Sequence, residues 1–98
     1  MTYRVEFRPE ASADVAGAFS WYEAQRPGLG AEFEAALDHT LGFIATMPAA
    51  GRVVHRTLRR ASIRRFPFGV YYILGADLIE IRGVLHNSRD PRTWRRRA

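Results

Sequence analysis

The chain has 98 residues, of which 47% are hydrophobic and 12% aromatic, so it suits one folded domain over residues 1–98 and not an intrinsically disordered segment. It contains no cysteine, which excludes a disulfide framework, a thiolate metal site and a cysteine nucleophile. The net charge is +5, but residues 1–50 carry three arginines against seven acids and residues 51–98 carry twelve arginines against three acids, which predicts one strongly basic surface for an acidic protein or a nucleic acid.

The first half of the chain predicts a strand followed by two helices. Residues 3–7 alternate between apolar and charged side chains, which is typical of a half-buried strand. Pro9 opens a helix, since proline is tolerated in a first turn, and the Arg-Pro-Gly sequence at 26–28 ends it. A second helix has apolar residues at helical spacing over 33–44 and ends before Pro48. The short turn between them predicts an antiparallel helical hairpin.

The second half of the chain predicts strands. Residues 58–65 form a polar and basic strand, and residues 69–74 are apolar on both faces, as in the centre of a sheet. A tight turn follows, and residues 78–86 return as the partner strand. Asp90 is a good cap for a last short helix over residues 91–97.

The predicted element order is therefore β-α-α-β-β-β with a possible short C-terminal helix, which indicates an α+β fold. A helical hairpin packed on one face of a small, mainly antiparallel sheet buries both amphipathic surfaces. We expect the opposite sheet face to be open and lined by arginine. The longest apolar run, residues 70–74, is too short to cross a membrane and no signal peptide opens the chain, so we expect a soluble, cytoplasmic protein.

The candidate catalytic residues lie on the last predicted strand. In a regular strand Glu80, Arg82 and His86 share one face. An imidazole beside guanidinium groups tends to stay neutral, the form that a general base needs, and RNA cleavage requires a base, an acid and positive charge at the phosphate. The alternative is that His86 is a hydrogen-bonded histidine at a strand end. His39 is expected on a helix surface and His55 in a connecting loop, and the histidine spacings predict no metal site.

The arginines of the second half supply the candidate binding residues. Together they could form a continuous basic surface, although a solvated edge strand is the simpler alternative. The tryptophan among them could stack on a base or pin the C-terminal segment to the core. The candidate binding residues are Arg59, Arg60, Arg64, Arg65, Arg89 and Trp94. No cofactor is predicted.

Several short motifs, taken in order over nearly the whole chain, resemble toxins of the RelE/ParE superfamily, which belong to bacterial type II toxin–antitoxin modules. The order and spacing of the motifs are specific for the superfamily and less so for its branches. The motifs are Tyr3-Arg4-Val5-Glu6-Phe7 with Pro9, Trp21-Tyr22, Leu29-Gly30, Arg64-Arg65-Phe66-Pro67-Phe68, Tyr71-Tyr72, Val84-Leu85-His86, and Arg89-Asp90-Pro91 with Trp94.

The resemblance implies a cognate antitoxin that binds and silences the toxin, so that the candidate binding residues would contact the antitoxin or the target in a toxin–antitoxin hetero-oligomer. It also implies one of two activities. ParE-like toxins inhibit DNA gyrase, whereas RelE-like toxins cut mRNA on the ribosome, for which His86, Arg82 and Glu80 would be the catalytic residues. RelE-like enzymes tend to carry an arginine where Gly69 stands, often end in a catalytic tyrosine, and use lysines that this chain lacks. The ParE-like activity is therefore favoured.

Overall fold

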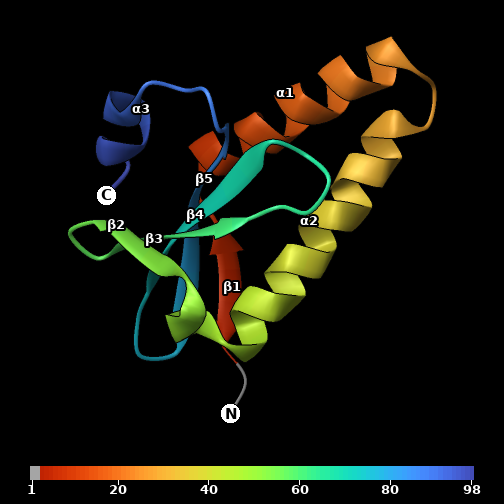
Figure 1. Ribbon diagram of the computed structural model, residues 1–98. Coiled ribbons are helices and arrows are strands. Elements are labelled where there is room, and N and C mark those ends of the chain that lie inside the picture. Colours follow the sequence, from red (N-terminus) through yellow and green to blue (C-terminus); the bar gives the residue numbers. More distant parts are fainter. Residues whose placement is uncertain (1–2) are drawn as a thin grey trace.

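The computed structural model describes residues 3–98 as an α+β fold in which two long helices cover one face of a five-stranded sheet (Figure 1). The strands lie in the order β1-β5-β4-β3-β2. β1 pairs with β5 in parallel and the other neighbours are antiparallel, which confirms the predicted mainly antiparallel sheet. The strands are β1 (Arg4–Phe7), β2 (Arg52–His55), β3 (Leu58–Ser62), β4 (Phe68–Leu74) and β5 (Leu78–His86).

The strand β2 differs from the prediction, which has only three strands after the helices and places His55 in a connecting loop. β2 forms a tight hairpin with β3, and Arg56 in the turn has a φ of 53°. Glycine or asparagine usually occupies such a left-handed position, so the sequence lacks the ordinary signal for a hairpin here. The element order is therefore β-α-α-β-β-β-β, and His55 is a strand residue.

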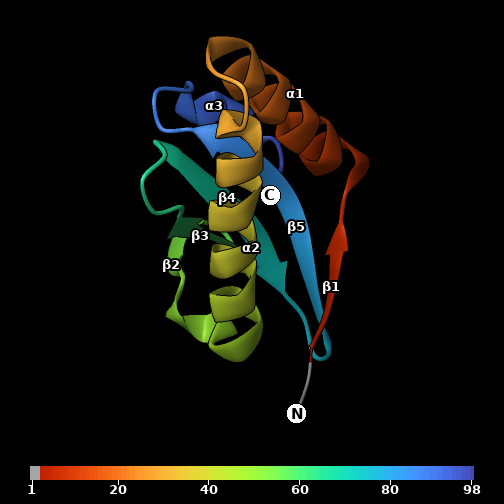
Figure 2. The ribbon, with the colours of Figure 1, turned by 90° about the vertical axis from the view of Figure 1, so that its right-hand side faces the viewer.

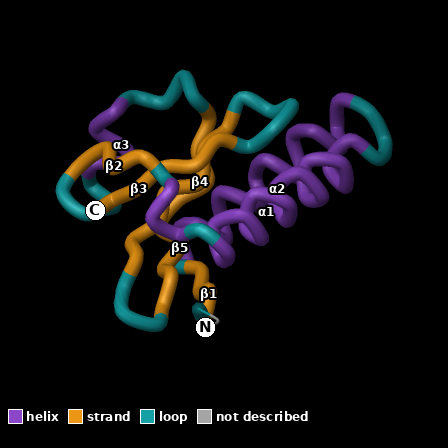
Figure 3. The backbone as a smooth tube through the Cα atoms, turned by 60° about the horizontal axis from the view of Figure 1, so that its bottom comes forward, coloured by secondary structure: helices purple, strands orange, loops and turns teal. Residues whose placement is uncertain are grey.

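The helices α1 (Pro9–Gln25) and α2 (Leu29–Thr46) form the predicted hairpin and lie side by side against the sheet (Figures 2 and 3). Their connection depends on Gly28, which has a φ of 90°, and on Gly30, where an added Cβ would lie 2.8 Å from an aromatic ring of α1. The Glu23 carboxylate accepts hydrogen bonds from the backbone N–H groups of both glycines, at 2.9 and 2.8 Å. No helix among residues 3–98 is long and apolar enough to cross a bilayer.

An aromatic cluster joins the helical hairpin to the sheet. The rings of Tyr22 and Phe33, one from each helix, stack with their centroids 5.4 Å apart. Phe66 packs edge-on against both rings at 5.0 and 5.4 Å, and Phe68 at the start of β4 lies 5.1 Å from Phe33. Stacked and edge-to-face rings are the favourable arrangements for aromatic pairs. The larger buried aliphatic residues of this core are Leu37, Ile44, Ile63, Val70, Ile79, Ile81 and Val84.

The opposite face of the sheet is not open. A second, smaller cluster of Leu58, Tyr71 and Leu85 is buried there, because these residues alternate onto that face and need cover from water. The short helix α3 (Pro91–Arg95) provides the cover: the Trp94 ring stacks on the Tyr71 ring with the centroids 5.7 Å apart. The predicted C-terminal helix is confirmed, and the prediction of an open, arginine-lined face is wrong.

Candidate partner-binding site

A β-bulge in β5 decides where the candidate catalytic residues lie. Ile81 and Gly83 pair with consecutive residues of β4, so Arg82, which lies between them, has no pairing partner in β4. Side chains alternate between the two faces along a strand, so one extra residue moves every later side chain to the other face. His86 therefore lies on the helix-covered face, and the prediction that it shares a face with Glu80 and Arg82 is wrong.

Glu80 and Arg82 remain together on the face that α3 covers. Arg82 Nε donates a hydrogen bond to the Glu80 carboxylate, and Arg82 Nη1 donates to the backbone carbonyl of Arg97 at 2.9 Å. Their side chains are only 25% and 29% exposed. Glu80 and Arg82 are thus paired with each other, and Arg82 is also hydrogen-bonded to the C-terminal segment, so both side chains are engaged within the fold.

His86 is held by a local turn at the end of β5. Its Nδ1 accepts a hydrogen bond from the backbone N–H of Ser88 at 3.0 Å, and the Ser88 hydroxyl lies 2.8 Å from the same nitrogen. A backbone N–H can only donate, so in the neutral ring the proton is on Nε2. The imidazole is then a hydrogen-bond donor at its open nitrogen. Its ring packs edge-on against Phe68, 5.2 Å away.

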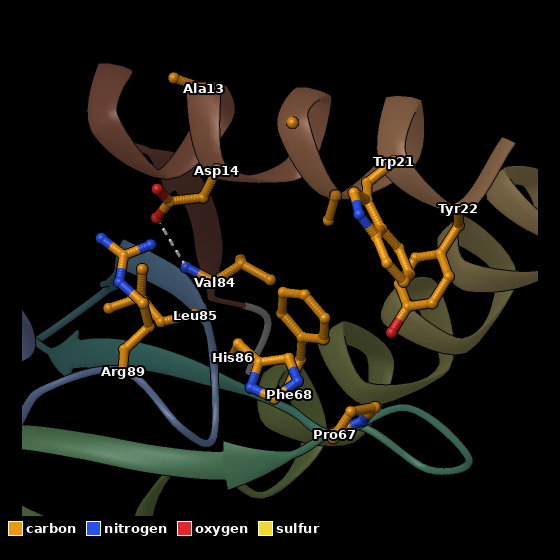
Figure 4. Close-up of a pocket in the computed structure, with 12 residues that line it drawn as sticks. Ala13, Asp14, Trp21, Tyr22, Pro67, Phe68, Val84, Leu85, His86 and Arg89 are labelled. Atoms are coloured by element: carbon orange, nitrogen blue, oxygen red, sulfur yellow. Dashed lines mark hydrogen bonds between the residues drawn. The ribbon is translucent and has the colours of Figure 1, made fainter. Parts of the chain in front are cut away.

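A groove of about 640 Å³ lies between α1 and the adjoining ends of β4 and β5 (Figure 4). We call it the Trp21 groove. Trp21 stands on its α1 wall with 60% of its surface exposed, and Phe68 and His86 form the opposite wall. Gly17 adds no side chain to the α1 wall, and the space beside it is open, since an added Cβ would meet nothing within 4 Å. Arg89 is the one arginine among the lining residues, so the groove mainly offers apolar surface to a partner.

Asp14, at one end of this groove, has a structural role. Its Oδ2 accepts a hydrogen bond from the backbone N–H of Val84 at 3.0 Å (Figure 4), and its carboxylate forms an ion pair with Arg97 at 2.6 Å. The two charged side chains are 13% and 16% exposed. Arg97 Nη1 also donates to the carbonyl of Arg82, in the bulge, at 3.0 Å. Asp14 thus ties helix α1, the bulge of β5 and the C-terminal segment together.

Comparison with known proteins gives the family. The family model described as "ParE toxin of type II toxin-antitoxin system, parDE" matches residues 5–91. The chain belongs to the ParE toxin family. Its fold is similar to that of a solved chain titled "Chromosomal ParDE TA system from P. aeruginosa", with a TM-score of 0.74 and 14% sequence identity over 86% of this chain and 95% of that chain. No curated protein matches the chain.

Family membership confirms the resemblance found in the sequence. The protein is the toxin of a type II toxin–antitoxin module, and a cognate antitoxin is its partner. The predicted ParE-like branch is also confirmed, because the match is to the ParE model. The residues of this ParE toxin that contact the antitoxin stay a prediction.

Two of the candidate binding residues of the ParE toxin already form hydrogen bonds within the fold. Arg59 Nη1 donates hydrogen bonds to the carbonyls of Ala49 and Gly51, at 2.9 and 2.8 Å, and so fixes the chain between α2 and β2. Arg60 lies across Gly69, where the absence of a side chain leaves room for its guanidinium group. That group donates to Ser62, Tyr71 and Asn87.

The other candidate binding residues do not form one continuous surface. Arg64 and Arg65 are exposed between β3 and β4, next to α2. Arg65 forms an ion pair with Glu32 at 3.1 Å, and hydrogen bonds from Arg26 and Arg65 lower the pKa of that carboxyl. Arg89 is exposed at the Trp21 groove. Trp94, which belongs to α3, packs on Tyr71 of the sheet. Their roles in binding stay predictions, but they belong to three separate parts of the molecule.

The sequence contains one signal for the Trp21 groove. Trp21 and Tyr22 are adjacent in a helix, and neighbouring helical side chains point about 100° apart, which favours burial of one ring and exposure of the other. The structure buries Tyr22 and exposes Trp21. The anchoring role of Asp14 has no such signal, because it depends on Val84 and Arg97, which are distant in the sequence. Among residues 3–98 there is no cluster of three metal-ligating side chains.

Proposed function

We propose that this ParE toxin inhibits DNA gyrase by binding to it and acts without a catalytic step. The proposal that the toxin has no catalytic step rests on the bulge at Arg82, which separates His86 from Glu80 and Arg82. A general acid and a general base must both reach the same substrate in hydrogen-bonding geometry. Side chains on opposite faces of a sheet do not meet this requirement.

The state of each group also supports a non-catalytic role. His86 presents Nε2–H at its open nitrogen and would have to rearrange before it could take a proton. Arg82 donates a hydrogen bond to Glu80, and on the same face of the sheet the Trp94 ring covers the Tyr71 ring. An mRNA-cleaving site would need these groups on an accessible face.

The Trp21 groove favours a protein partner over a nucleic acid. A surface that binds nucleic acid must carry several cations, because most of its affinity comes from neutralised phosphates. Arg89 is the one arginine that lines this groove, and Asp14, at its end, is a carboxylate. An apolar groove with an exposed tryptophan is the type of surface that receives an apolar segment of another protein.

The first test measures inhibition of purified gyrase by the purified toxin in a DNA supercoiling assay. We expect inhibition that depends on toxin concentration and that is unchanged in the Glu80→Gln variant, since Glu80 lies outside the Trp21 groove. In bacteria that express the toxin alone, thymidine incorporation should fall before methionine incorporation. The proposal also places the toxin in the cytoplasm, where gyrase acts.

The opposite order of events would overturn the proposal. If methionine incorporation falls first and Glu80→Gln abolishes growth inhibition while the variant keeps its far-UV circular dichroism, the toxin is an mRNA endonuclease. The site to dissect would then be the sheet face beneath α3.

A further inference from the structure

A second groove, of about 490 Å³, lies on the other side of α2, between that helix and the edge formed by β2 and β3. We call it the arginine-lined groove. Its lining includes Arg52, Arg60 and Arg64 together with His39, and it includes no carboxylate. This composition differs from that of the Trp21 groove, which is mainly apolar. Three of the twelve arginines of the second half of the chain therefore line one concave surface.

Two of these arginines are available to a partner. Arg52 and Arg64 are exposed, and neither takes part in an ion pair among the described residues. Arg60, by contrast, is half-buried and hydrogen-bonded to Ser62 and Asn87. The nearest neighbouring hollow contains Glu32, but that carboxylate already pairs with arginines at 3.0 and 3.1 Å.

The arginine-lined groove also carries apolar surface. Phe43 of α2 lines it and is 49% exposed. Met47, directly after α2, and Val53 of the edge strand β2 are also exposed, by 54% and 50%, but they lie outside the lining of this groove. A large apolar side chain left in water next to cations is typical of a surface that binds a partner with both apolar and acidic side chains.

We propose that the arginine-lined groove binds an acidic segment of the antitoxin, with carboxylates against Arg52 and Arg64 and an apolar side chain against Phe43. The antitoxin is the partner that family membership gives, and a toxin of net charge +5 attracts an acidic one. The groove itself selects for acidic side chains, because three arginines line it and no carboxylate competes for them. The proposal rests on family membership and does not depend on gyrase being the target.

The test compares two double variants of the full-length toxin that change the net charge by the same amount. Arg52→Glu with Arg64→Glu alters the groove, and Arg4→Glu with Arg96→Glu alters two exposed arginines elsewhere. Any loss that comes only from the overall charge of the toxin is then equal in the two proteins. Far-UV circular dichroism and urea unfolding verify that both variants are folded.

The measured quantity is the dissociation constant for the purified antitoxin of the same module, by isothermal titration calorimetry at two salt concentrations. We expect the groove variant to bind about tenfold more weakly than the control variant, with a smaller salt dependence. Phe43→Ser should also weaken binding but leave the salt dependence unchanged, because it removes apolar contact and no charge.

Equal affinities of the two double variants would overturn the proposal. The supercoiling assay on the same proteins then identifies the alternative: loss of gyrase inhibition in the groove variant alone would assign the groove to the target. Because antitoxin binding is measured without gyrase, failure of the proposed gyrase activity would leave this result interpretable.

Discussion

The two faces of the sheet are covered in different ways. The face under α1 and α2 buries a continuous core of aromatic and aliphatic side chains, with Phe33 fully enclosed. The face under α3 buries a small hydrophobic cluster of Leu58, Tyr71 and Leu85, and its cover is the partly buried Trp94 on a helix of five residues. The hydrophobic effect scales with buried apolar area, so the first face dominates the stability of the toxin.

The weaker face depends on polar contacts. Arg97 and Arg82 exchange hydrogen bonds through their side chains and carbonyls, and Arg97 also pairs with Asp14 of α1. Helix α3 is therefore held by one aromatic stack and one buried ionic network. We therefore expect the C-terminal segment to loosen without unfolding of the main core. Three substitutions test this difference, and a fourth tests the turn between α1 and α2.

The largest effect is expected for Phe33→Ala. Phe33 is completely buried and contacts three other aromatic rings, so its removal leaves a cavity in the main core. The free energy of unfolding should fall by about 3–5 kcal/mol. Urea denaturation followed by circular dichroism measures this, with Phe43→Ala on the exposed side of the same helix as the control. Similar losses in both variants would show that the aromatic cluster is not the centre of the core.

The next largest effect is expected for Asp14→Ala. The substitution leaves the Val84 N–H and the Arg97 guanidinium without their shared acceptor. The free energy of unfolding should fall by about 1.5–3 kcal/mol, the range for a lost hydrogen bond to a charged group. Limited proteolysis should also cut the C-terminal segment sooner. If Asp38→Ala, at an exposed position of α2, has the same effect on both measurements, the network does not hold α3.

A smaller effect is expected for Trp94→Ala. The aromatic stack on Tyr71 contributes about 1 kcal/mol beyond the area that it buries. Amide hydrogen exchange should become faster in α3 and along β3, while the helices α1 and α2 keep their protection. Trp21→Ala serves as the control, since that side chain is 60% exposed. Faster exchange throughout the protein would mean that the two faces unfold together.

The smallest effect is expected for Glu23→Gln, at the turn between the helices. Hydrogen bonds from the N–H groups of Gly28 and Gly30 lower the pKa of the Glu23 carboxyl. A lowered pKa stabilises the fold above the ordinary pKa of a glutamate, and this contribution is lost as the pH falls through the lower pKa of the folded state.

The variant should therefore be less stable than the parent at neutral pH and equally stable in strong acid. Thermal unfolding between neutral and acidic pH measures the difference, with Glu34→Gln, exposed on α2, as the control. A constant difference at every pH would show that the charge of Glu23 is not involved.

Much of the fold could be predicted because it depends on local patterns. The alternation at 3–7, the helical spacing at 33–44 and the apolar run at 69–74 each specify an element through side-chain periodicity alone. The Asp90 cap likewise predicted α3. The edge strand β2 was missed because Arg56 occupies a turn position that usually carries a glycine.

The sequence by itself determined the elements other than β2, the family and the absence of thiol and lysine chemistry, since these follow from residue identity and short-range order. The tertiary structure alone decided which residues lie together. The bulge at Arg82 depends on how β5 pairs with β4, and it reverses the face of His86. The ion pair of Asp14 with Arg97 joins residues 83 positions apart. Such pairings depend on the packing of whole elements, which no local pattern encodes.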